Sequence, residues 1–517
     1  MKKIFPLFLF LCFIISSKSF AQTDLNLSSV ASFDAEPTLA VNPSNTNNIV
    51  CAWMGTSGLR VSIKVKASHD GGVTWGTVGV MPHLNSTTSS ADPTLAFDGS
   101  GNCFLSYVDF TQTGSPAGVI YSAKSTDGGD TWSVPNVAIN QSEDATLPID
   151  RPWIAIDRGT AHTGRIYLCT MGANWIPTPR HVFLKYSDDA GVTWSSLKIV
   201  DTLPWGIPDG VVSMGVPGVD KSGRLYIAYL GMNPAYSTTL PIMIVATTDS
   251  NASNLTLTYR YAGVYVGVAD TTIQQGWALA ADPSHSGRMI LAWTQKPFTS
   301  ATVQIYKNYT ENGGITWGSP QKVNDDAGDS TTQDMVWCSW ATGSKPIIAW
   351  RDHRRFTSST TSPFDIYASV SFDHGQSFEA NYRVNSDTCD YAILTKGNDF
   401  IGIGQAGTKT VAVWGDHRTG DWEVFFNRTS TPLGAEEIES AAPEFSVIYD
   451  EQFNPFLKLR QAEKSDYEVF DLLGRKVASE KLTGEKLIAL PQPDPGIYFV
   501  RMKSEVVKYL VITSKPD

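Results

Sequence analysis

The sequence lacks the features that mark several classes of protein. Of its 517 residues 18% are charged, the formal net charge is -11, and Lys and Arg form no basic cluster. Because a nucleic-acid-binding surface needs such a cluster to neutralise phosphates, the composition argues against nucleic acid as a partner. After residue 21, no stretch is apolar over the roughly 18 residues that a membrane helix needs. We therefore expect no membrane span in the mature chain.

Cysteine is also scarce. The chain has 6 Cys, with no C-x-x-C pair and no spacing typical of a metal site. Cys12 lies in an N-terminal segment that we expect to be removed. The others fall in different repeats: Cys51, Cys103, Cys169, Cys338 and Cys389. We expect buried free thiols, with one disulfide as the alternative, and we predict neither a metal nor a cofactor.

Residues 1–21 have the order of parts found in a secretory signal peptide. Lys2 and Lys3 precede an apolar run over residues 4–15, and Ala21 ends a short stretch with small residues. We expect cleavage after Ala21 and export of the remaining chain.

A box of the form S-x-D-x-G-x-T-W recurs along the sequence. It occupies residues 68–75, 125–132, 187–194, 310–317 and 371–378, and a remnant with Thr247 and Asp249 stands in the longest gap. Intervals of about 60 residues, one of them doubled, are typical of repeat architectures. Asp and Gly at this spacing predict a tight turn, with the aromatic residue covering it. Because scattered copies cannot form one active site, we interpret the following residues as structural: Asp70, Trp75, Asp127, Trp132, Asp189, Trp194, Asn312, Trp317, Asp373 and Phe378.

Each box closes a longer unit. The units begin at Glu36, Asp92, Asp150, Asp209, Gln275, Asp334 and Asp399. Each continues as a second apolar strand, a third that enters the box and a fourth that leaves it. Four antiparallel strands in each of seven units predict an all-β fold, a seven-bladed β-propeller over residues 22–430. The last unit lacks a fourth strand, so we expect the segment with Leu25 and Leu27 to complete blade seven and leave no open edge.

After a polar linker at residues 431–443 the periodicity changes. Residues 467–477, 494–500 and 508–512 have the pattern of short strands separated by turns. They predict a small C-terminal β-sandwich within residues 444–517.

The order of the strands separates two rims. The boxes and the turns between strands one and two share one rim. The starts of strand one lie on the other, around a funnel where loops converge and where we expect a ligand. Its ring of acidic unit-leading residues is either a pocket that holds a cation or supplies acid–base groups, or a set of caps for the entry turns. Arg151, directly after Asp150, has no counterpart in the other units, which makes both residues catalytic candidates.

Blades six and seven carry a duplicated motif on the funnel side, W-R-D-H-R at 350–354 and W-G-D-H-R at 414–418. Asp and Arg together can bind a substrate carboxylate and move a proton. The catalytic candidates here are Asp352, Arg354, Asp416 and Arg418, and the substrate-binding candidates are His353 and His417. The alternative is that the arginines pair with acidic residues of their own blades: Asp365, Asp421 or Glu423.

Two tryptophans stand near the funnel in blade three and before blade four. Trp175 and Trp205 could offer flat faces to sugar rings, because aromatic side chains with polar edges suit amphipathic ligands. The alternative is that both serve ordinary packing.

The C-terminal segment resembles the type A sorting domain of the type IX secretion system of Bacteroidetes. The resemblance rests on D-L-L-G-R-K-V at 471–477, P-G-I-Y-F-V at 495–500 and K-Y-L-V-I at 508–512. It implies export across the outer membrane with the type IX secretion machinery as a partner. It also implies removal of this domain and release of the protein or its anchoring at the cell surface.

The repeated boxes resemble the Asp-box, or BNR, repeats of the sialidase-like β-propeller superfamily. Sialidases hold the substrate carboxylate with three arginines and use a Tyr–Glu pair and an Asp. The resemblance implies a secreted, glycan-directed protein, with a sialidase-like glycoside hydrolase as the first hypothesis. Blade one has Glu36, Pro37 and Thr38 where the family has Arg-Ile-Pro, and seven units replace the family's six blades.

Two other functions remain open at this stage. One is a non-catalytic surface protein that binds a glycan or another protein through the same loops, since a fold does not fix a function. The other is a polysaccharide lyase, in which His353, His417 or His181 would act as the base beside an arginine. The sequence leaves undecided whether the chain is an enzyme.

Overall fold

Two units make up the computed structural model, Met1–Thr431 and Pro432–Asp517. In the first, the structure describes residues 23–28, 33–111, 118–143, 149–159, 162–172, 180–209, 211–238, 240–249, 252, 255–264, 276–296, 302–327, 330–341, 345–356, 363–390 and 399–431. In the second, it describes residues 432, 445–449, 454–459, 466–471, 475–481, 487–491, 496–502 and 505–511. The signal peptide expected at 1–21 and most of the linker lie outside these ranges.

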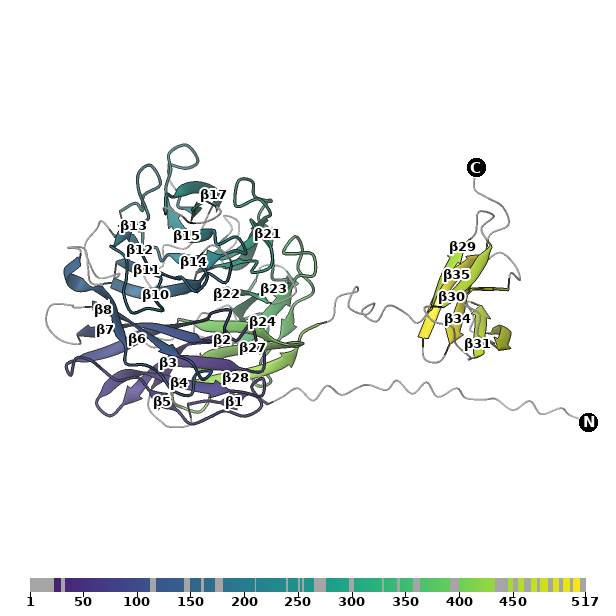
Figure 1. Ribbon diagram of the computed structural model, residues 1–517, viewed down its shortest axis with the longest axis horizontal. Helices are drawn as coiled ribbons and strands as arrows, with labels where there is room; N and C mark the ends of the chain where they lie inside the picture. Colours follow the sequence, from purple (N-terminus) through teal and green to yellow (C-terminus); the bar gives the residue numbers. More distant parts are fainter. Residues whose placement is uncertain are drawn as a thin grey trace, which may run out of the picture. The chain divides into compact units, whose positions relative to one another are not determined.

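Seven four-stranded antiparallel sheets form the first unit, as predicted (Figure 1). Blade one contains β2 (Asp34–Val41), β3 (Ile49–Ser57), β4 (Arg60–Ser68) and β5 (Gly79–Val80). Blade two contains β6 (Thr88–Phe97), β7 (Cys103–Thr111), β8 (Gly118–Ser125) and β9 (Asn136–Asn140), which the short 3-10 helix η1 (Gln141–Glu143) follows. Blade three contains β10 (Ile149–Ile156), β11 (Ile166–Gly172), β12 (Val182–Ser187) and β13 (Lys198–Ile199).

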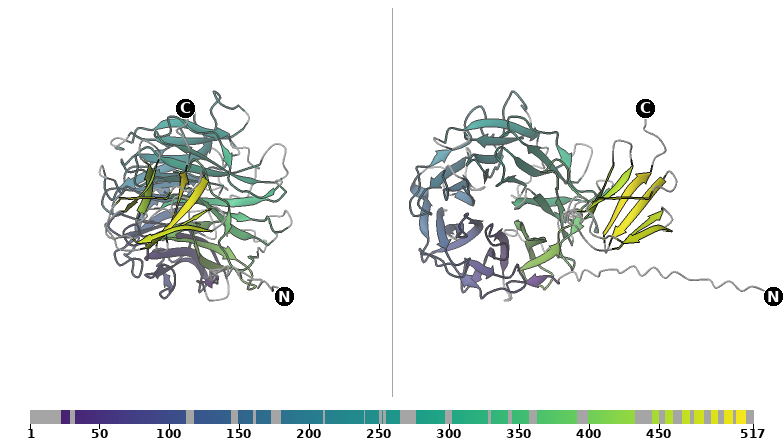
Figure 2. Two further views of the ribbon diagram at one scale, coloured as in Figure 1. Left: turned by 90° about the vertical axis from the view of Figure 1, so that its right-hand side faces the viewer. Right: turned by 45° about the vertical axis from the view of Figure 1, so that its right-hand side comes forward.

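The remaining blades repeat this order. Blade four contains β14 (Val216–Val219), β15 (Leu225–Gly231), β16 (Ile242–Thr247) and β17 (Thr258–Val264). Blade five contains β18 (Trp277–Ala281), β19 (Met289–Gln295), β20 (Gln304–Thr310) and β21 (Gln321–Lys322). Blade six contains β22 (Gln333–Ala341), β23 (Lys345–Asp352), β24 (Asp365–Val370) and β25 (Tyr382–Arg383). Blade seven contains β26 (Ile401–Ala406), β27 (Lys409–Asp416) and β28 (Glu423–Ser430). Figure 2 shows these sheets arranged around a common centre.

The N-terminal strand closes the ring, which confirms the prediction. β1 (Leu25–Asn26) pairs antiparallel with β28, with Leu25 opposite Phe426. Asp24 fixes its start, because its carboxylate accepts a hydrogen bond of 2.6 Å from Asn427 Nδ2 and lies 2.8 Å from Arg418 Nη1. Blade seven therefore has no unpaired outer edge where the chain begins.

The boxes are hydrogen-bonded turns. In the second copy Asp127 Oδ1 accepts hydrogen bonds from Ser125 Oγ at 2.7 Å and from the Thr131 N–H at 3.0 Å. Burial opposes ionisation, but the hydrogen bonds from Thr131 and Ser125 lower the pKa of Asp127 to about 2. The same backbone hydrogen bond is made by the equivalent residues of the other copies, Asp70, Asp189, Asn312 and Asp373.

Each box also contacts the preceding blade. Gly129 has φ +104°, and a Cβ there would lie 2.4 Å from Val50 of blade one. Lys307 of blade five donates a hydrogen bond of 2.8 Å to the Gly375 carbonyl in the next box. The aromatic side chains of the boxes contact either their own turn or the interface with a neighbouring blade. Trp132 and Trp194 bond their own turns, Trp75 contacts Phe426 of blade seven, and Trp317 and Phe378 pack against inter-blade clusters.

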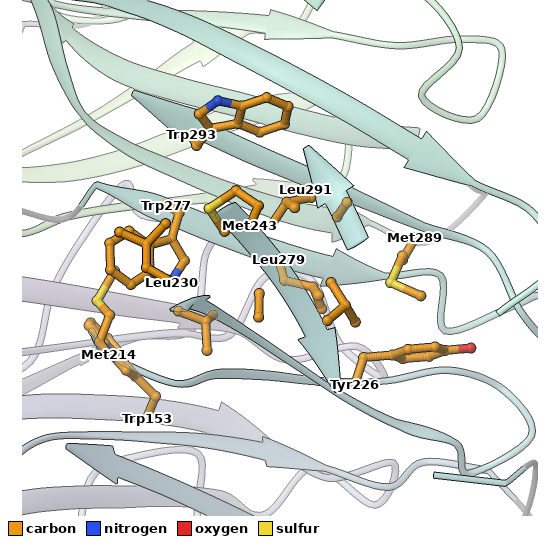
Figure 3. Packing of buried hydrophobic residues seen from close by; sticks show 14 of the residues in the cluster. Trp153, Met214, Tyr226, Leu230, Met243, Trp277, Leu279, Met289, Leu291 and Trp293 are labelled. Atoms are coloured by element: carbon orange, nitrogen blue, oxygen red, sulfur yellow. The ribbon is translucent and has the colours of Figure 1, made fainter. Parts of the chain in front are cut away.

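Apolar side chains between the blades form the core. Figure 3 shows one cluster, which runs from β14–β16 and β18–β19 to Trp153 of β10. Strand two of blades one, five, six and seven contributes a fully buried tryptophan at a repeated position: Trp53, Trp293, Trp350 and Trp414. Burying such side chains supplies much of the folding free energy. The five described cysteines are buried free thiols, as expected from their spacing.

The second unit is a small β-sandwich, as predicted. One sheet joins β29 (Phe445–Tyr449), β30 (Pro455–Leu459) and β33 (Leu487–Ala489). The other joins β31 (Asp466–Asp471), β32 (Lys476–Lys481), β34 (Gly496–Met502) and β35 (Glu505–Val511). Leu457 of the first sheet shares a buried cluster with Tyr467 and Val500 of the second. Within the described ranges of both units, no helix is long and apolar enough to cross a membrane.

Candidate functional site

The inner strands of blades one, two, three and six begin with the same β-bulge. Two residues of strand one face a single residue of strand two, after the pairs Ala35–Met54, Ala91–Val108, Asp150–Met171 and Asp334–Arg351. The first bulged residue has positive φ in each case, at Glu36 (51°), Asp92 (53°), Arg151 (51°) and Met335 (51°). Such backbone conformations are uncommon outside glycine and gather at functional sites.

The bulges revise the alignment of the blades. By sequence, Asp150 leads blade three as Glu36 and Asp92 lead blades one and two. In the structure Arg151 takes their bulged position and Asp150 precedes it. In these three blades proline fits the bulge, because strand Pro is confined to edges and bulges, and Pro37, Pro93 and Pro152 directly follow the bulged residues. Blade six forms the same bulge with Val336 at this position.

Arg151 joins carboxyl groups from four blades. Its Nη2 pairs with the Asp399 carboxylate of blade seven. Its backbone N–H donates to Asp150 Oδ1 at 3.1 Å and to Asp92 Oδ2 at 3.3 Å. Because blades three and seven are not neighbours, this ion pair reaches across the funnel end of the propeller. The site thus combines a predicted candidate, Arg151, with four members of the predicted acidic ring: Glu36, Asp92, Asp150 and Asp399.

The carboxyl groups share protons. Burial, then the charge of Asp399, raises the pKa of Glu36 to about 8. Burial, then the charge of Glu36, raises the pKa of Asp92 to about 8. Burial and the neighbouring Asp92 raise the pKa of Asp150 as well. If the Glu36 carboxyl were ionised, its Oε2 would be a buried oxygen that accepts no hydrogen bond. A proton on one carboxyl supplies that bond, because like charges in contact cannot all ionise.

The members of the cluster differ in access. Glu36, Asp92 and Arg151 are 6%, 8% and 5% exposed, whereas the Asp399 side chain is 21% exposed. Asp399 and Asp150 are both half-buried and are therefore the carboxyl groups of the cluster that a ligand can reach, and the buried groups set their electrostatic surroundings.

Aromatic rings close the centre beneath the cluster. The Arg151 guanidinium lies 4.9 Å from the centre of the Phe400 ring. Trp153 lies 4.9 Å from Trp337 of blade six and 5.1 Å from Phe400, measured between ring centres. An apolar floor of this kind lowers the local dielectric, which strengthens the interactions among the charges above it.

A second arginine of the funnel end is paired within its own blade. Arg351 donates from Nε and Nη2 to the two oxygens of Asp334, both at 2.6 Å, and both residues are buried. Asp334 of the predicted ring is thus held in an ion pair. Asp209 is exposed, and Gln275 lies outside the described residues. Among the ring positions that the structure describes, those of blades seven, one, two and three are the ones brought together.

The last arginine of each duplicated motif pairs with the aspartate of its own motif and with a second carboxylate from another segment. Arg354 Nη2 lies 2.9 Å from Asp352 and its Nη1 lies 2.6 Å from Asp325. Arg418 pairs with Asp416 at 2.5 Å and with Asp24. Both aspartates also accept a hydrogen bond from the preceding tryptophan, Trp350 or Trp414. These contacts give both motifs a role in holding the strand ends, and their catalytic candidacy stays a prediction.

The histidine and tryptophan candidates lie in different surroundings. His353 is fully buried, with Nδ1 3.1 Å from the Pro363 carbonyl oxygen, and the His417 ring lies 5.7 Å from Trp422. Trp205 packs against Tyr236 and Tyr259, with ring centres 5.5 Å and 6.0 Å away. Trp175 lies outside the described residues. His181 Nδ1 lies 3.0 Å from Asp201. In the described part of the chain, no group of three or more His, Cys, Asp or Glu side chains is arranged to hold a metal ion.

No protein-family model and no curated protein matches this sequence. Solved structures that resemble it include a protein of unknown function from Dyadobacter fermentans, with 13% identity and a TM-score of 0.44 over 80% of this chain and 99% of that one. A Hadza microbial sialidase matches with 13% identity and a TM-score of 0.41 over 72% and 74% of the two chains. An α-L-arabinanase of Penicillium chrysogenum matches with 12% identity and a TM-score of 0.42 over 79% and 98%. The seven-bladed fold rests on the sheets described above.

Proposed function

We propose that this protein is a glycan-directed β-propeller whose funnel cluster supplies acid–base chemistry, and that a glycoside hydrolase is its best-supported function. One observation carries the proposal. The accessible Asp399 carboxylate adjoins Glu36, whose pKa of about 8 keeps a proton available near neutral pH. Most glycoside hydrolases also combine a carboxylic acid with a carboxylate, held about 5–9.5 Å apart, whereas Glu36 and Asp399 are in hydrogen-bond contact and would act through one shared proton.

The pairing of the arginines narrows the substrate class. Arg151 and Arg351 are the arginines of this cluster and its neighbouring blade, and carboxylates of the protein occupy both. A sugar carboxylate would have to displace those partners. We therefore favour a neutral glycan over a sialoside, which departs from the sialidase-like hypothesis in substrate while keeping its class of reaction.

A matched pair of variants tests the proposal. The mature chain is screened against neutral polysaccharides and sialosides for release of reducing ends. Asp399→Asn is expected to reduce turnover by at least about a hundredfold, the scale of general acid–base catalysis. Asp334→Asn, which breaks a buried ion pair outside the cluster, should lower stability and spare turnover in the folded protein. Turnover that survives Asp399→Asn would refute the assigned chemistry.

A second candidate is a non-catalytic glycan-binding protein. The burial of Glu36, Asp92 and Arg151 favours this candidate, because a buried cluster can have the purely structural role of holding the blades together. Glycan binding without turnover, retained in Asp399→Ala, would support this reading. The lyase alternative has no support at His353, which is fully buried and is not placed to take a proton from a ligand. His417 and His181 are half-buried and stay the candidate bases for it.

We also propose that the protein works outside the cell. The signal peptide at 1–21 and the sorting-domain resemblance at 444–517 support this location. Mass spectrometry of the protein from its native source should find an N-terminus at Gln22 and no peptides from the C-terminal unit. Intact residues 1–21 on the mature protein would contradict the proposal.

A further inference from the structure

The box rim of blade four carries a pocket that the funnel chemistry does not use. Its volume is about 390 Å³, within the roughly 300–1,000 Å³ typical of small-molecule sites. Blade four contributes Arg224, Thr248, Asp249, Thr258 and Arg260 to its lining, and Gly313 comes from the box of blade five. The pocket thus lies where blade four has lost most of its own box.

Arg224 differs from its counterparts in the neighbouring blades in its charge pairing. Arginines stand at the same position, just before strand two, in blades three and five. Arg165 pairs with Asp188 at 2.6 Å, and Arg288 lies 3.4 Å from Glu311. Across the described residues Arg224 forms no such ion pair, and its Nε is buried without a hydrogen-bond partner. A guanidinium that lacks a carboxylate partner gains from an anion more than a paired one does.

The two arginines of the pocket, Arg224 and Arg260, are held in place by backbone around them. A Cβ built on Gly313 would lie 1.9 Å from Arg224 Nη1, so this guanidinium rests directly on the box backbone of blade five. Arg260 donates through Nη1 to the Tyr259 carbonyl oxygen at 3.1 Å, which fixes its orientation without neutralising its charge. Two oriented guanidinium groups thus face one pocket whose single carboxylate in the described lining is Asp249.

We propose that this pocket binds a tetrahedral oxyanion, the sulfate ester of a glycan or a phosphate group. Guanidinium forks match the oxygens of such anions, and the Thr258 hydroxyl in the lining can supply a further donor. The inference stands apart from the function proposed for the funnel, because it rests on other residues at the opposite rim.

The test uses the full mature chain and titration calorimetry. The probes are sodium sulfate, sodium phosphate and galactose 6-sulfate, with sodium chloride at equal ionic strength and unsulfated galactose as controls. Binding of a sulfate or phosphate probe above the chloride control is expected. Preference for galactose 6-sulfate over the free ions indicates a sulfated glycan, and the reverse preference indicates a free anion. Binding of no probe beyond the controls overturns the proposal.

Charge variants localise the binding. Arg224→Gln and Arg260→Gln are each expected to weaken binding at least tenfold. Asp249→Asn should strengthen it, because the substitution removes the carboxylate of the lining. Arg288→Gln is the matched control, since it removes an arginine from the same position in blade five and should leave the affinity unchanged. If Arg224→Gln fails to fold, Arg260→Gln decides alone. Unchanged affinity in the folded arginine variants overturns the assignment.

Discussion

The shared protons of the funnel cluster predict a particular dependence of stability on pH. Glu36 and Asp92 both have a pKa near 8 in the folded protein, above the ordinary values of 4.5 and 3.8. A carboxyl whose pKa is raised by folding stabilises the fold below its ordinary pKa, and that contribution is lost as the pH rises through the folded value. Between about pH 6 and 8 the loss is about 1.4 kcal/mol per pH unit for each proton held only by the folded state.

Glu36→Gln replaces the protonated carboxyl by a neutral group of the same shape. Thermal unfolding of this variant should depend less on pH from 6 to 8 than that of the wild type, and the variant should be the more stable of the two at pH 8. A difference of about 2 kcal/mol corresponds to a shift of a few degrees. Asp334→Asn provides the control, because it should lower stability equally at all these pH values.

One other group must be separated from this effect. Burial lowers the pKa of Lys307 to about 8, against the charge of Asp373. Because the folded state releases this proton at a lower pH than the unfolded state does, the lysine makes the fold more stable as the pH rises above 8. The comparison of Glu36→Gln with the wild type is therefore made below pH 8 and on the difference between the two proteins. A wild-type stability that is constant or rising from pH 6 to 8, with an equal profile in Glu36→Gln, would refute the shared-proton interpretation.

Two further outcomes follow from the packing of the blades. Gly129→Ala should lower the free energy of unfolding by about 2–5 kcal/mol, because it combines positive φ with a Cβ 2.4 Å from Val50. Its thermal unfolding is compared with that of the control Gly164→Ala, where φ is +89° but no atom lies within 4 Å of the added Cβ. Asp24→Ala removes the ion pair with Arg418 at 2.8 Å and should release β1, seen as faster hydrogen exchange at residues 25–28. Exchange that stays as slow as in the wild type would show that strand pairing alone holds the N-terminus.

The sequence predicted the propeller because its information is local and repeated. The hydrogen bonds that shape the turn of the box at 125–132 run between residues of the box itself, from Ser125 to Trp132, so a short stretch of sequence is enough to recognise it. The outer strand of blade seven could be predicted in the same way. The last unit has only three strands in the sequence, so its fourth strand has to come from another segment of the chain. Alternation at Leu25 and Leu27 pointed to that segment.

The candidate site was only partly predictable, because it forms where side chains from blades far apart in the sequence come together at the centre of the ring. The sequence named Arg151 and the acidic ring, yet it did not show that Arg151 meets Asp399 of blade seven. The bulge was missed as well, although Pro152 standing in line with Pro37 and Pro93 carried the signal. The pocket of blade four was missed because the absence of an ion pair at Arg224 can be seen only once its neighbours are in place.

The pairing of Leu25 with Phe426 makes the start of the propeller the last part to find its place. During synthesis, the first strand leaves the ribosome long before blade seven exists, and it has to wait, unpaired, until nearly the whole propeller has been translated. A nascent or truncated chain that stops short of β28 cannot complete the circle, however many blades it has already folded. Ring closure thereby acts as a check on completeness, and a protease that removes residues 23–28 before closure would leave blades one to six intact and blade seven without its outer strand.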